Sequence, residues 1–176
     1  MVCAMTAAEA FDSVTSGGAG DFAKVVRVLA RHQPWCLIGG LAVNCYVEPV
    51  YTLDADIVVV AEMLPEIEAG LQAAGFVTEK FAHSVNARMG NSQLSIQLST
   101  DPRYQTFVSD TEEREVFGIR VPVAVLTNLI RGKVWAWRDP ARRASKRKKD
   151  ELDLLRIAEA YPELRATIPA EIVAQL

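Results

Sequence analysis

Two aspartates, Asp54 and Asp56, stand at alternating positions in the segment DADIVVV. Three consecutive valines favour a β-strand, in which alternate side chains share one face, so the two carboxylates point the same way and lie roughly 7 Å apart. Like charges this close oppose each other's ionisation unless a cation lies between them. Mg²⁺, which binds proteins through one or two carboxylates together with substrate phosphates, would supply that cation. The alternative is a polar strand start at a solvent-exposed edge, which needs no ligand.

A glycine pair precedes the aspartates in the segment IGGLAVN, where a buried strand is expected to turn into a short helix. Because Gly39 and Gly40 lack Cβ atoms, a phosphate can approach their backbone, and the free N–H groups at a helix start attract anions. The alternative is a tight turn that only requires positive φ angles.

Lys133 interrupts an apolar stripe on the helix expected over residues 125–137. The stripe consists of Leu126, Leu129, Ile130, Val134 and Trp137. At 100° per residue Lys133 falls near the centre of this stripe, and a lysine seldom faces a core without a partner for its charge. Two interpretations stay open: the side chain points into an anionic site, or it reaches water past Trp137.

A charged segment follows, RRASKRKKDELDLL. Asp150 and Asp153 are three residues apart and therefore share a helical face. They belong to a site, or they only neutralise the basic residues 146–149. The basic residues from Arg142 to Lys149 spread around the helix, so most are expected to be solvated, while one or two facing a phosphate backbone would give salt-dependent binding.

Composition indicates an ordinary globular chain. It has 176 residues, half of them apolar, which suffices for one domain with a core and a small helical appendage. The net charge of −3 gives no global attraction to nucleic acid or membrane. The three cysteines show no metal-type spacing, and neither a signal peptide nor a long apolar segment is present. We therefore expect a cytoplasmic protein that does not contact a membrane.

Hydrophobic periodicity and turn residues predict alternating helices and strands. Helices are expected over residues 6–16, 22–32, 41–47, 64–74, 125–137 and 140–160, with a short one after Pro169. Strands are expected over residues 35–39, 54–60, 114–117 and 119–121, with several short ones between 76 and 100, of which QLSIQLS is the clearest. Asp21 is the expected N-cap of the second helix.

Taken together, these segments resemble the nucleotidyltransferase superfamily that includes DNA polymerase β, and within it the small bacterial branch related to AbiEii-type abortive-infection toxins. The match runs in order from about Trp35 to Leu155: IGGLAVN resembles the glycine signature, TLDADIVV the carboxylate strand, and the segment from Val121 to Leu155 the later lysine, arginine-rich turn and acidic helix. The resemblance implies an α/β (α+β) fold, with a mixed sheet flanked by helices and then a C-terminal helical region. We place the nucleotidyltransferase-like core at residues 1–122 and the helical region at 123–176.

The resemblance also implies roles for individual residues. Asp54 and Asp56 would be catalytic and hold Mg²⁺ (or Mn²⁺), with Gln97 as a further metal ligand. The remaining catalytic residues would be Lys133 and Asp150. A nucleoside triphosphate would be bound by Gly39, Gly40, Asn44, Lys133 and Arg142.

One position departs from the family pattern. Where the family commonly carries a third carboxylate on a neighbouring strand, the segment SIQLS has Gln97. An amide can ligate a cation but cannot act as a base. The site then works with fewer charges, or Asp101 or Glu48 substitutes, or the enzyme has lost activity.

The function expected from the sequence is metal-dependent transfer of a nucleoside monophosphate from an NTP to a hydroxyl of RNA, protein or a small molecule, in a toxin-like role. The alternatives are a catalytically degenerate nucleotide-binding or nucleic-acid-binding protein of the same fold, and an antitoxin-like protein that docks a partner through its helical region.

Overall fold

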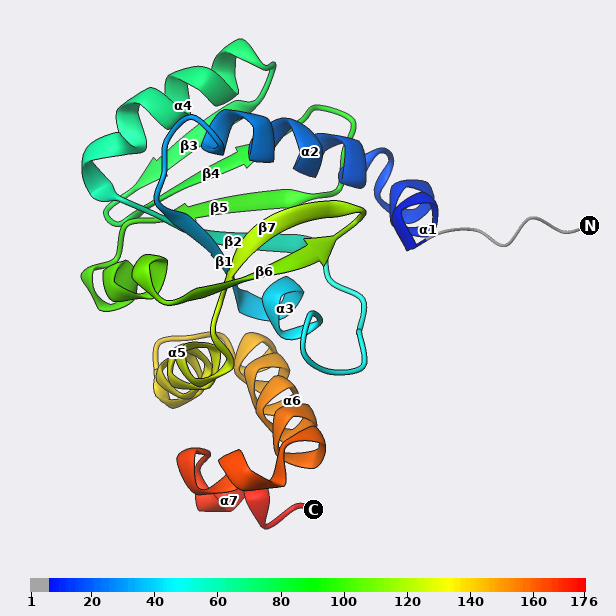
Figure 1. The fold of residues 1–176 in the computed structure, drawn as a ribbon, viewed down its shortest axis with the longest axis vertical. Coiled ribbons are helices and arrows are strands. Elements are labelled where there is room, and N and C mark those ends of the chain that lie inside the picture. The colour runs from blue at the N-terminus through cyan, green and yellow to red at the C-terminus, as the bar shows by residue number, and fades with distance from the viewer. Residues whose placement is uncertain (1–6) are drawn as a thin grey trace, which may run out of the picture.

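The computed structural model describes residues 7–176, which form one mixed sheet with helices on both faces (Figure 1). The start of the first expected helix, at residue 6, lies outside the described residues. The strands are β1 Trp35–Ile38, β2 Asp54–Val59, β3 Val77–Phe81, β4 Ser84–Arg88, β5 Ser95–Ser99, β6 Thr111–Val116 and β7 Ile119–Ala124. The α-helices are α1 Ala7–Thr15, α2 Gly18–Leu29, α3 Gly39–Val43, α4 Leu64–Ala73, α5 Leu126–Arg138, α6 Ala144–Ala160 and α7 Ala170–Val173. Three 3₁₀ helices, η1 Ala61–Met63, η2 Pro102–Ser109 and η3 Pro162–Thr167, complete the elements.

The seven strands lie in the order β3-β4-β5-β2-β1-β7-β6. Strand β2 pairs with β1 in antiparallel and with β5 in parallel orientation, and β1 pairs with β7 in parallel. A mixed sheet of this kind, flanked by helices, confirms the predicted fold class. It also places β2, which carries both aspartates of the DADIVVV segment, in the middle of the sheet.

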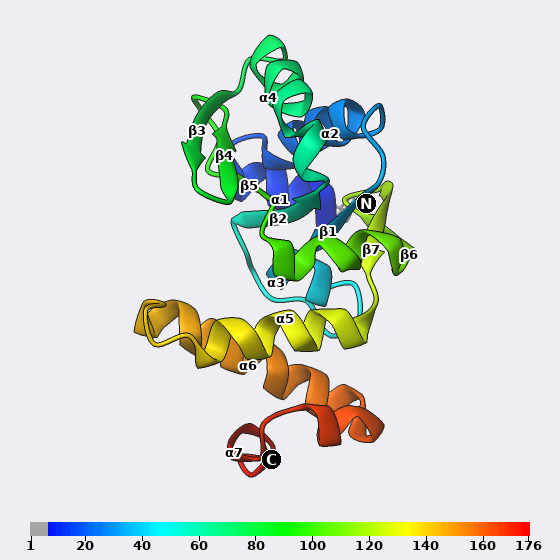
Figure 2. The same ribbon diagram turned by 90° about the vertical axis from the view of Figure 1, so that its left-hand side faces the viewer.

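Helices α2 and α4 cover one face of the sheet, while α3, α5 and α6 lie on the other (Figures 1 and 2). Gly70 lets α4 approach α2 closely, because a Cβ at this position would lie 2.8 Å from Val28 Cγ1. The chain ends below α6, on the side away from the sheet. None of the helices within residues 7–176 combines the length and the apolar character that a membrane crossing requires.

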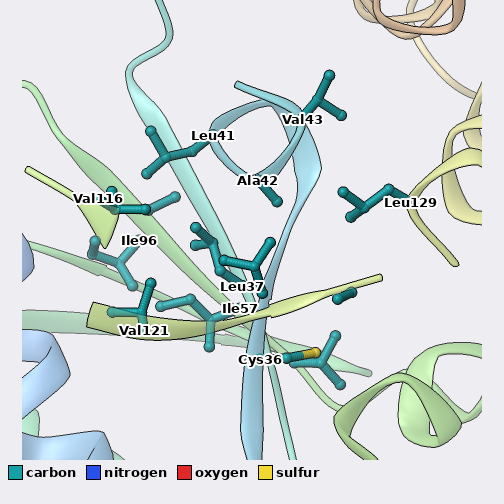
Figure 3. Packing of buried hydrophobic residues seen from close by; sticks show 14 of the residues in the cluster. Cys36, Leu37, Leu41, Ala42, Val43, Ile57, Ile96, Val116, Val121 and Leu129 are labelled. Atoms are coloured by element: carbon teal, nitrogen blue, oxygen red, sulfur yellow. The ribbon is translucent and has the colours of Figure 1, made fainter. Parts of the chain in front are cut away.

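The core is built from the apolar faces that the strand alternation predicts. Ala55, Ile57 and Val59 of β2 are fully buried, as is Leu37 of β1. Figure 3 shows Leu41, Ala42 and Val43 of α3 packing over these strands, with Leu129 of α5 beside them. The short helix α3 packs against β1, β2, α5 and α6, which holds the glycine turn at its start in place.

Two expectations about the helices are wrong. Helix α2 begins at Gly18, because Gly17 adopts φ +96° and the Thr15 hydroxyl accepts a hydrogen bond from Gly18 N at 2.8 Å. Asp21 is therefore not its N-cap but a buried residue inside the helix, paired with Lys24 at 2.8 Å. Helix α3 starts at the glycine pair itself and ends at Val43, earlier than the expected 41–47.

The strand expected to end at residue 121 continues through Pro122 to Ala124. A proline cannot donate to the sheet, so pattern analysis treats it as a stop. Here Pro122 lies opposite Glu113 of the edge strand β6, and β1 is paired with β7 only at Leu37 and Val123. The missing N–H group of Pro122 therefore costs the sheet few hydrogen bonds.

Candidate active site

The two aspartates lie at the start of β2, beside Gln97 of β5. The parallel register pairs Asp56 with Gln97 and Asp54 with Ser95. Leu98 and Ile96 are buried while Gln97 is exposed, so the amide faces the same side as the carboxylates, as the alternation predicts. Three oxygen-bearing side chains from two neighbouring strands thus gather at one point of the sheet.

Gly39 fits directly against one of these carboxylates. It adopts φ +73°, a conformation that favours glycine, and a Cβ added to it would overlap the carboxylate of Asp56. Gly40 differs, because its Cβ would meet nothing nearer than Thr52 Oγ1 at 3.7 Å. The first glycine is therefore required by the fold itself, whereas a Cβ at the second would make only ordinary van der Waals contacts, with Thr52 and Asp153.

The Asp56 carboxylate is partly buried, and within residues 7–176 no side chain donates a hydrogen bond to it. Burial raises the pKa of the Asp56 carboxyl, an effect that the nearby Lys133 opposes and the charge of Asp54 reinforces. A cation that binds beside such a carboxylate stabilises its charged form.

Lys133 of α5 points into an acidic cluster rather than past Trp137 to water. Its Nζ lies 2.9 Å from Asp150 Oδ1 and 2.6 Å from Asp153 Oδ2, and its side chain is only 11% exposed. Burial alone would lower the pKa of Lys133, but the charges of Asp153 and Asp150 outweigh it and raise that pKa. Lys133 is therefore a fixed, buried cation beside Asp56.

The acids that hold Lys133 also hold two arginines. Arg142 Nε donates to Asp150 Oδ2 at 2.6 Å, and Arg156 Nη1 donates to Asp153 Oδ1 at 2.7 Å. Both oxygens of Asp150 therefore accept from cations. This arrangement makes Asp150 a positioning residue for Lys133 and Arg142.

Lys146 makes a contact that the sequence did not reveal. Its Nζ lies 2.6 Å from Asp54 Oδ2, although the two residues are 92 positions apart in the chain. One signal was present: Lys146, Asp150 and Asp153 follow at i, i+4 and i+7 and so share a helical face. The basic run of α6 thus places one ammonium against the first aspartate of β2.

Two cavities meet at this centre, and Asp56, Gln97, Lys133, Arg142 and Asp150 line both. The first, of about 280 Å³, continues along η2 and α5. The second, of about 430 Å³, opens between the loop before β2 and helix α6. Residues that sequence analysis did not assign to a site complete them: His83, Arg103 and Tyr104 in the first, and Thr52, Arg88, Lys146 and Lys149 in the second.

The other sequence-predicted residues occupy different places. Asn44 lies outside both sets of lining residues; its amide is bonded to the backbone of Val50, at 2.7 and 3.1 Å, and to Arg156, at 2.9 Å. Of the two possible substitutes for the third carboxylate, Asp101 lines the first cavity but is bound to Arg103, and Glu48 lines neither. Within residues 7–176 no cluster of three or more His, Cys, Asp or Glu side chains is arranged to hold a metal ion.

Comparisons with known proteins agree with this architecture. No protein-family model matches the sequence, and a search of curated proteins finds no match. Among solved structures, the chain is similar to ANT(2'')-Ia in complex with adenylyl-2''-tobramycin, with 15% identity and a TM-score of 0.63 over 88% of this chain and 95% of that one.

Two further structures show the same arrangement. The lincosamide antibiotic adenylyltransferase LnuA matches with 10% identity and a TM-score of 0.54, over 76% of this chain and 94% of that one. An antigenic nucleotidyltransferase-like protein from Paracoccidioides brasiliensis matches with 14% identity and a TM-score of 0.53, over 89% and 96%. The chain therefore has the nucleotidyltransferase fold.

Proposed function

We propose that this protein is a metal-dependent nucleotidyltransferase that transfers a nucleoside monophosphate from an NTP to a hydroxyl acceptor. The observation that carries the proposal is the meeting of two strand carboxylates, a glycine turn and three cationic side chains at one pair of cavities. In phosphoryl transfer, catalysis consists almost entirely of positioning the substrate and neutralising the charge on its phosphates. The acidic and basic side chains gathered here are suited to both tasks.

The donor set fits a divalent cation. Asp54, Asp56 and Gln97 offer oxygen atoms, which Mg²⁺ and Mn²⁺ accept as ligands, and within residues 7–176 no side-chain hydrogen bond occupies the Asp56 carboxylate. With only two carboxylates, the substrate phosphates would complete the coordination. A bound cation would neutralise the triphosphate and the charge that develops as pyrophosphate leaves.

The protein's own residues have separable roles in this proposal. Gly40 would admit a phosphate beside the turn, while Lys133 and Arg142, both held by Asp150, line both cavities and would contact its oxygens. Lys146 pairs with Asp54 and would move to a phosphate oxygen when the cation binds. Asn44 holds the loop at Val50, and its contact with the nucleotide stays a prediction.

The second cavity is the better place for the triphosphate. Five basic side chains and four acidic ones line it, and three of those acids, Asp54, Asp150 and Asp153, are already paired. Arg88, Lys146 and Lys149 belong to this cavity and not to the first. Because basic side chains outnumber acidic ones in the second cavity, this cavity favours a polyanion.

The fold that this chain shares with the lincosamide antibiotic adenylyltransferase LnuA, and with ANT(2'')-Ia in complex with adenylyl-2''-tobramycin, supports nucleotidyl transfer. Neither the fold nor the sequence identity to these structures determines the acceptor. Because α6 carries a run of basic side chains, RNA and proteins are candidate acceptors as well as small molecules. The AbiEii-type assignment, a toxin–antitoxin partner and the cytoplasmic location stay predictions.

The test is transfer from α-labelled NTPs to a lysate and to total RNA by the purified protein. We expect label on an acceptor with Mg²⁺ present, and loss of at least about 100-fold in Asp54→Asn and Asp56→Asn, since each removes a charge from the centre. Glu79→Gln, on the far strand β3, is the control and should behave as wild type. Transfer that survives both aspartate substitutions would refute the proposal.

A second function, nucleotide binding without catalysis, is favoured by Gln97, which stands beside Asp56 where a third acid would complete the site. Under this alternative, wild type binds NTP but transfers nothing, and Gln97→Asp gains metal affinity. Turnover by pure wild-type protein rules it out.

A further inference from the structure

We infer that the first cavity binds a small, uncharged acceptor that carries hydroxyl groups beside an apolar face, and that it rejects acceptors bearing several ammonium groups. The inference rests on the proposed function, because it names the acceptor class of that site. It is carried by the ion pairing, the walls and the size of the cavity.

Two of the acids in this cavity, Asp101 and Asp150, are each paired with a cationic side chain of its lining. Three acids, Asp56, Asp101 and Asp150, line it together with one lysine and two arginines, Lys133, Arg103 and Arg142, and with His83. A ligand with several positive charges requires carboxylates that lack a cationic partner, since an acid that is already paired must first lose that partner.

Asp101 is paired within the cavity wall itself. Arg103 Nη2 lies 2.7 Å from Asp101 Oδ2, and Nε lies 3.1 and 3.2 Å from its two oxygens, so the guanidinium binds both. The hydrogen bonds from Arg103 lower the pKa of Asp101, which keeps the pair charged. A bidentate pair of this kind leaves the carboxylate little capacity for a ligand amine.

The other two acids are also committed. Asp150 accepts from Lys133 and Arg142, and Asp56 is the carboxylate that the proposed function gives to the cation. No carboxylate of this cavity is left for an ammonium group. An acceptor with several of them would lose its hydration without gaining ion pairs.

The walls offer apolar area and neutral hydrogen-bonding groups instead. Tyr104 and Phe107 meet edge to face with ring centroids 5.3 Å apart. Gly132 brings α5 close to them, because a Cβ there would lie 3.1 Å from Tyr104 Cε1. Neutral polar residues complete the lining: Ser84, Gln97 and Ser99.

The size of the cavity limits the acceptor further. About 280 Å³ lies at the lower end of volumes for small-molecule sites. Aromatic walls with a few neutral donors and acceptors match a single sugar ring or a molecule of similar size, with its apolar face on the rings and its hydroxyls toward Gln97 and Ser99. One hydroxyl then lies beside Asp56, where the transferred group would arrive.

The experiment measures binding of two probes to the full chain by calorimetry, with Mg²⁺ and the non-transferring analogue α,β-methylene-ATP, and again without nucleotide. The probes are phenyl β-glucoside, which is uncharged, and tobramycin, which is a polycation. We expect wild type to bind the glucoside at least about tenfold more tightly than tobramycin.

Releasing Asp101 should reverse this preference. In Arg103→Gln the carboxylate becomes free, and we expect tobramycin affinity to rise at least about fivefold while glucoside affinity changes little. In the double variant Asp101→Asn, Arg103→Gln that gain should disappear. Arg120→Gln, an exposed arginine on β7, controls for loss of surface charge.

The inference is overturned if tobramycin binds wild type as tightly as the glucoside, if the glucoside does not bind at millimolar concentration, or if Arg103→Gln leaves both affinities unchanged. It is also overturned if the ATP analogue displaces the glucoside, since the cavity would then hold the nucleoside. Failure of the proposed function looks different, because Mg²⁺-dependent binding of the ATP analogue would be absent while probe selectivity remained.

Discussion

At the scale of single residues, the Asp56 carboxylate of β2 packs against Gly39, at the start of α3. Gly39 combines a positive φ with direct contact to Asp56, whereas a Cβ at Gly40 would make only ordinary van der Waals contacts. The two neighbours therefore respond differently to the same substitution.

We predict that Gly39→Ala destabilises the protein by at least about 2 kcal/mol, since the left-handed conformation costs about 1–2 kcal/mol and the new Cβ displaces Asp56. Gly40→Ala should leave the free energy of unfolding within about 0.5 kcal/mol and weaken NTP binding, because its Cβ projects where we place a phosphate. Urea unfolding and NTP titration of both variants measure this. Equal stability losses would contradict the account.

The sequence predicted the residues of this centre better than their contacts. Alternation along β2 and β5 placed Asp54, Asp56 and Gln97 on one face, and the helical stripe singled out Lys133 as either facing an anionic site or reaching water. No pattern links Lys146 to Asp54, because that ion pair depends on how α6 crosses the sheet. Sequence periodicity describes one element at a time and carries no information on such crossings.

At the scale of elements, the edge strand β3 is attached to α4 by a polar cluster. Glu68 of α4 lies 2.7 Å from Lys80 Nζ and accepts from Thr78 Oγ1 at 2.9 Å. The hydrogen bond from Lys80 lowers the pKa of Glu68 below its ordinary 4.5. A lowered carboxyl pKa stabilises the fold above the unfolded-state pKa and ceases to do so as pH falls through the folded-state value.

We therefore predict that Glu68→Gln lowers the free energy of unfolding by about 1 kcal/mol at pH 7, discounted because Lys80 is largely exposed. The difference from wild type should shrink as the pH falls below about 4.5. Thermal unfolding between pH 3 and 7 measures it, with the exposed Glu79→Gln as control. A difference that grows toward acid pH would refute the assignment.

The elements most visible in the sequence were those with regular periodicity, such as β5 and α5. Helix η2 was not predicted, because a 3₁₀ segment does not follow the spacing that marks an α-helix. Since η2 contributes Tyr104 and Phe107 to the first cavity, the acceptor side of the candidate site could not be assembled from sequence. The start of α2 was misplaced because the Thr15 hydroxyl and the Asp12 carboxylate, and not Asp21, accept hydrogen bonds from the N–H groups of its first turn.

At the scale of the whole molecule, α6 joins the helical region to the sheet. Arg156 binds Asp153, the Asn44 amide and the Glu48 carbonyl, and Tyr161 donates to Tyr46 O at 3.0 Å. These contacts bridge more than 100 residues of chain. The second cavity is lined by five residues of α6 and by the loop before β2, so the docking of α6 shapes this cavity in particular.

We predict that Arg156→Ala destabilises the protein by about 1–3 kcal/mol, because the buried Asp153 carboxylate loses one of its two cationic partners and the bonds to Asn44 and Glu48 are lost. It should also weaken NTP binding, since Asn44 and the loop before β2 lose their anchor. Arg120→Ala, an exposed position on β7, should change stability by less than about 0.5 kcal/mol. An effect of Arg156→Ala no larger than that of Arg120→Ala would contradict this docking role.

The most direct measurement is calorimetric titration of each NTP, with and without Mg²⁺, onto wild type and Asp56→Asn. The account predicts that Mg²⁺ tightens binding of at least one NTP to wild type by about tenfold or more, and that Asp56→Asn, which keeps the shape but removes the charge, loses this dependence. If NTP affinity is the same with and without Mg²⁺, or if Asp56→Asn retains the dependence, the two aspartates do not form a metal–nucleotide site.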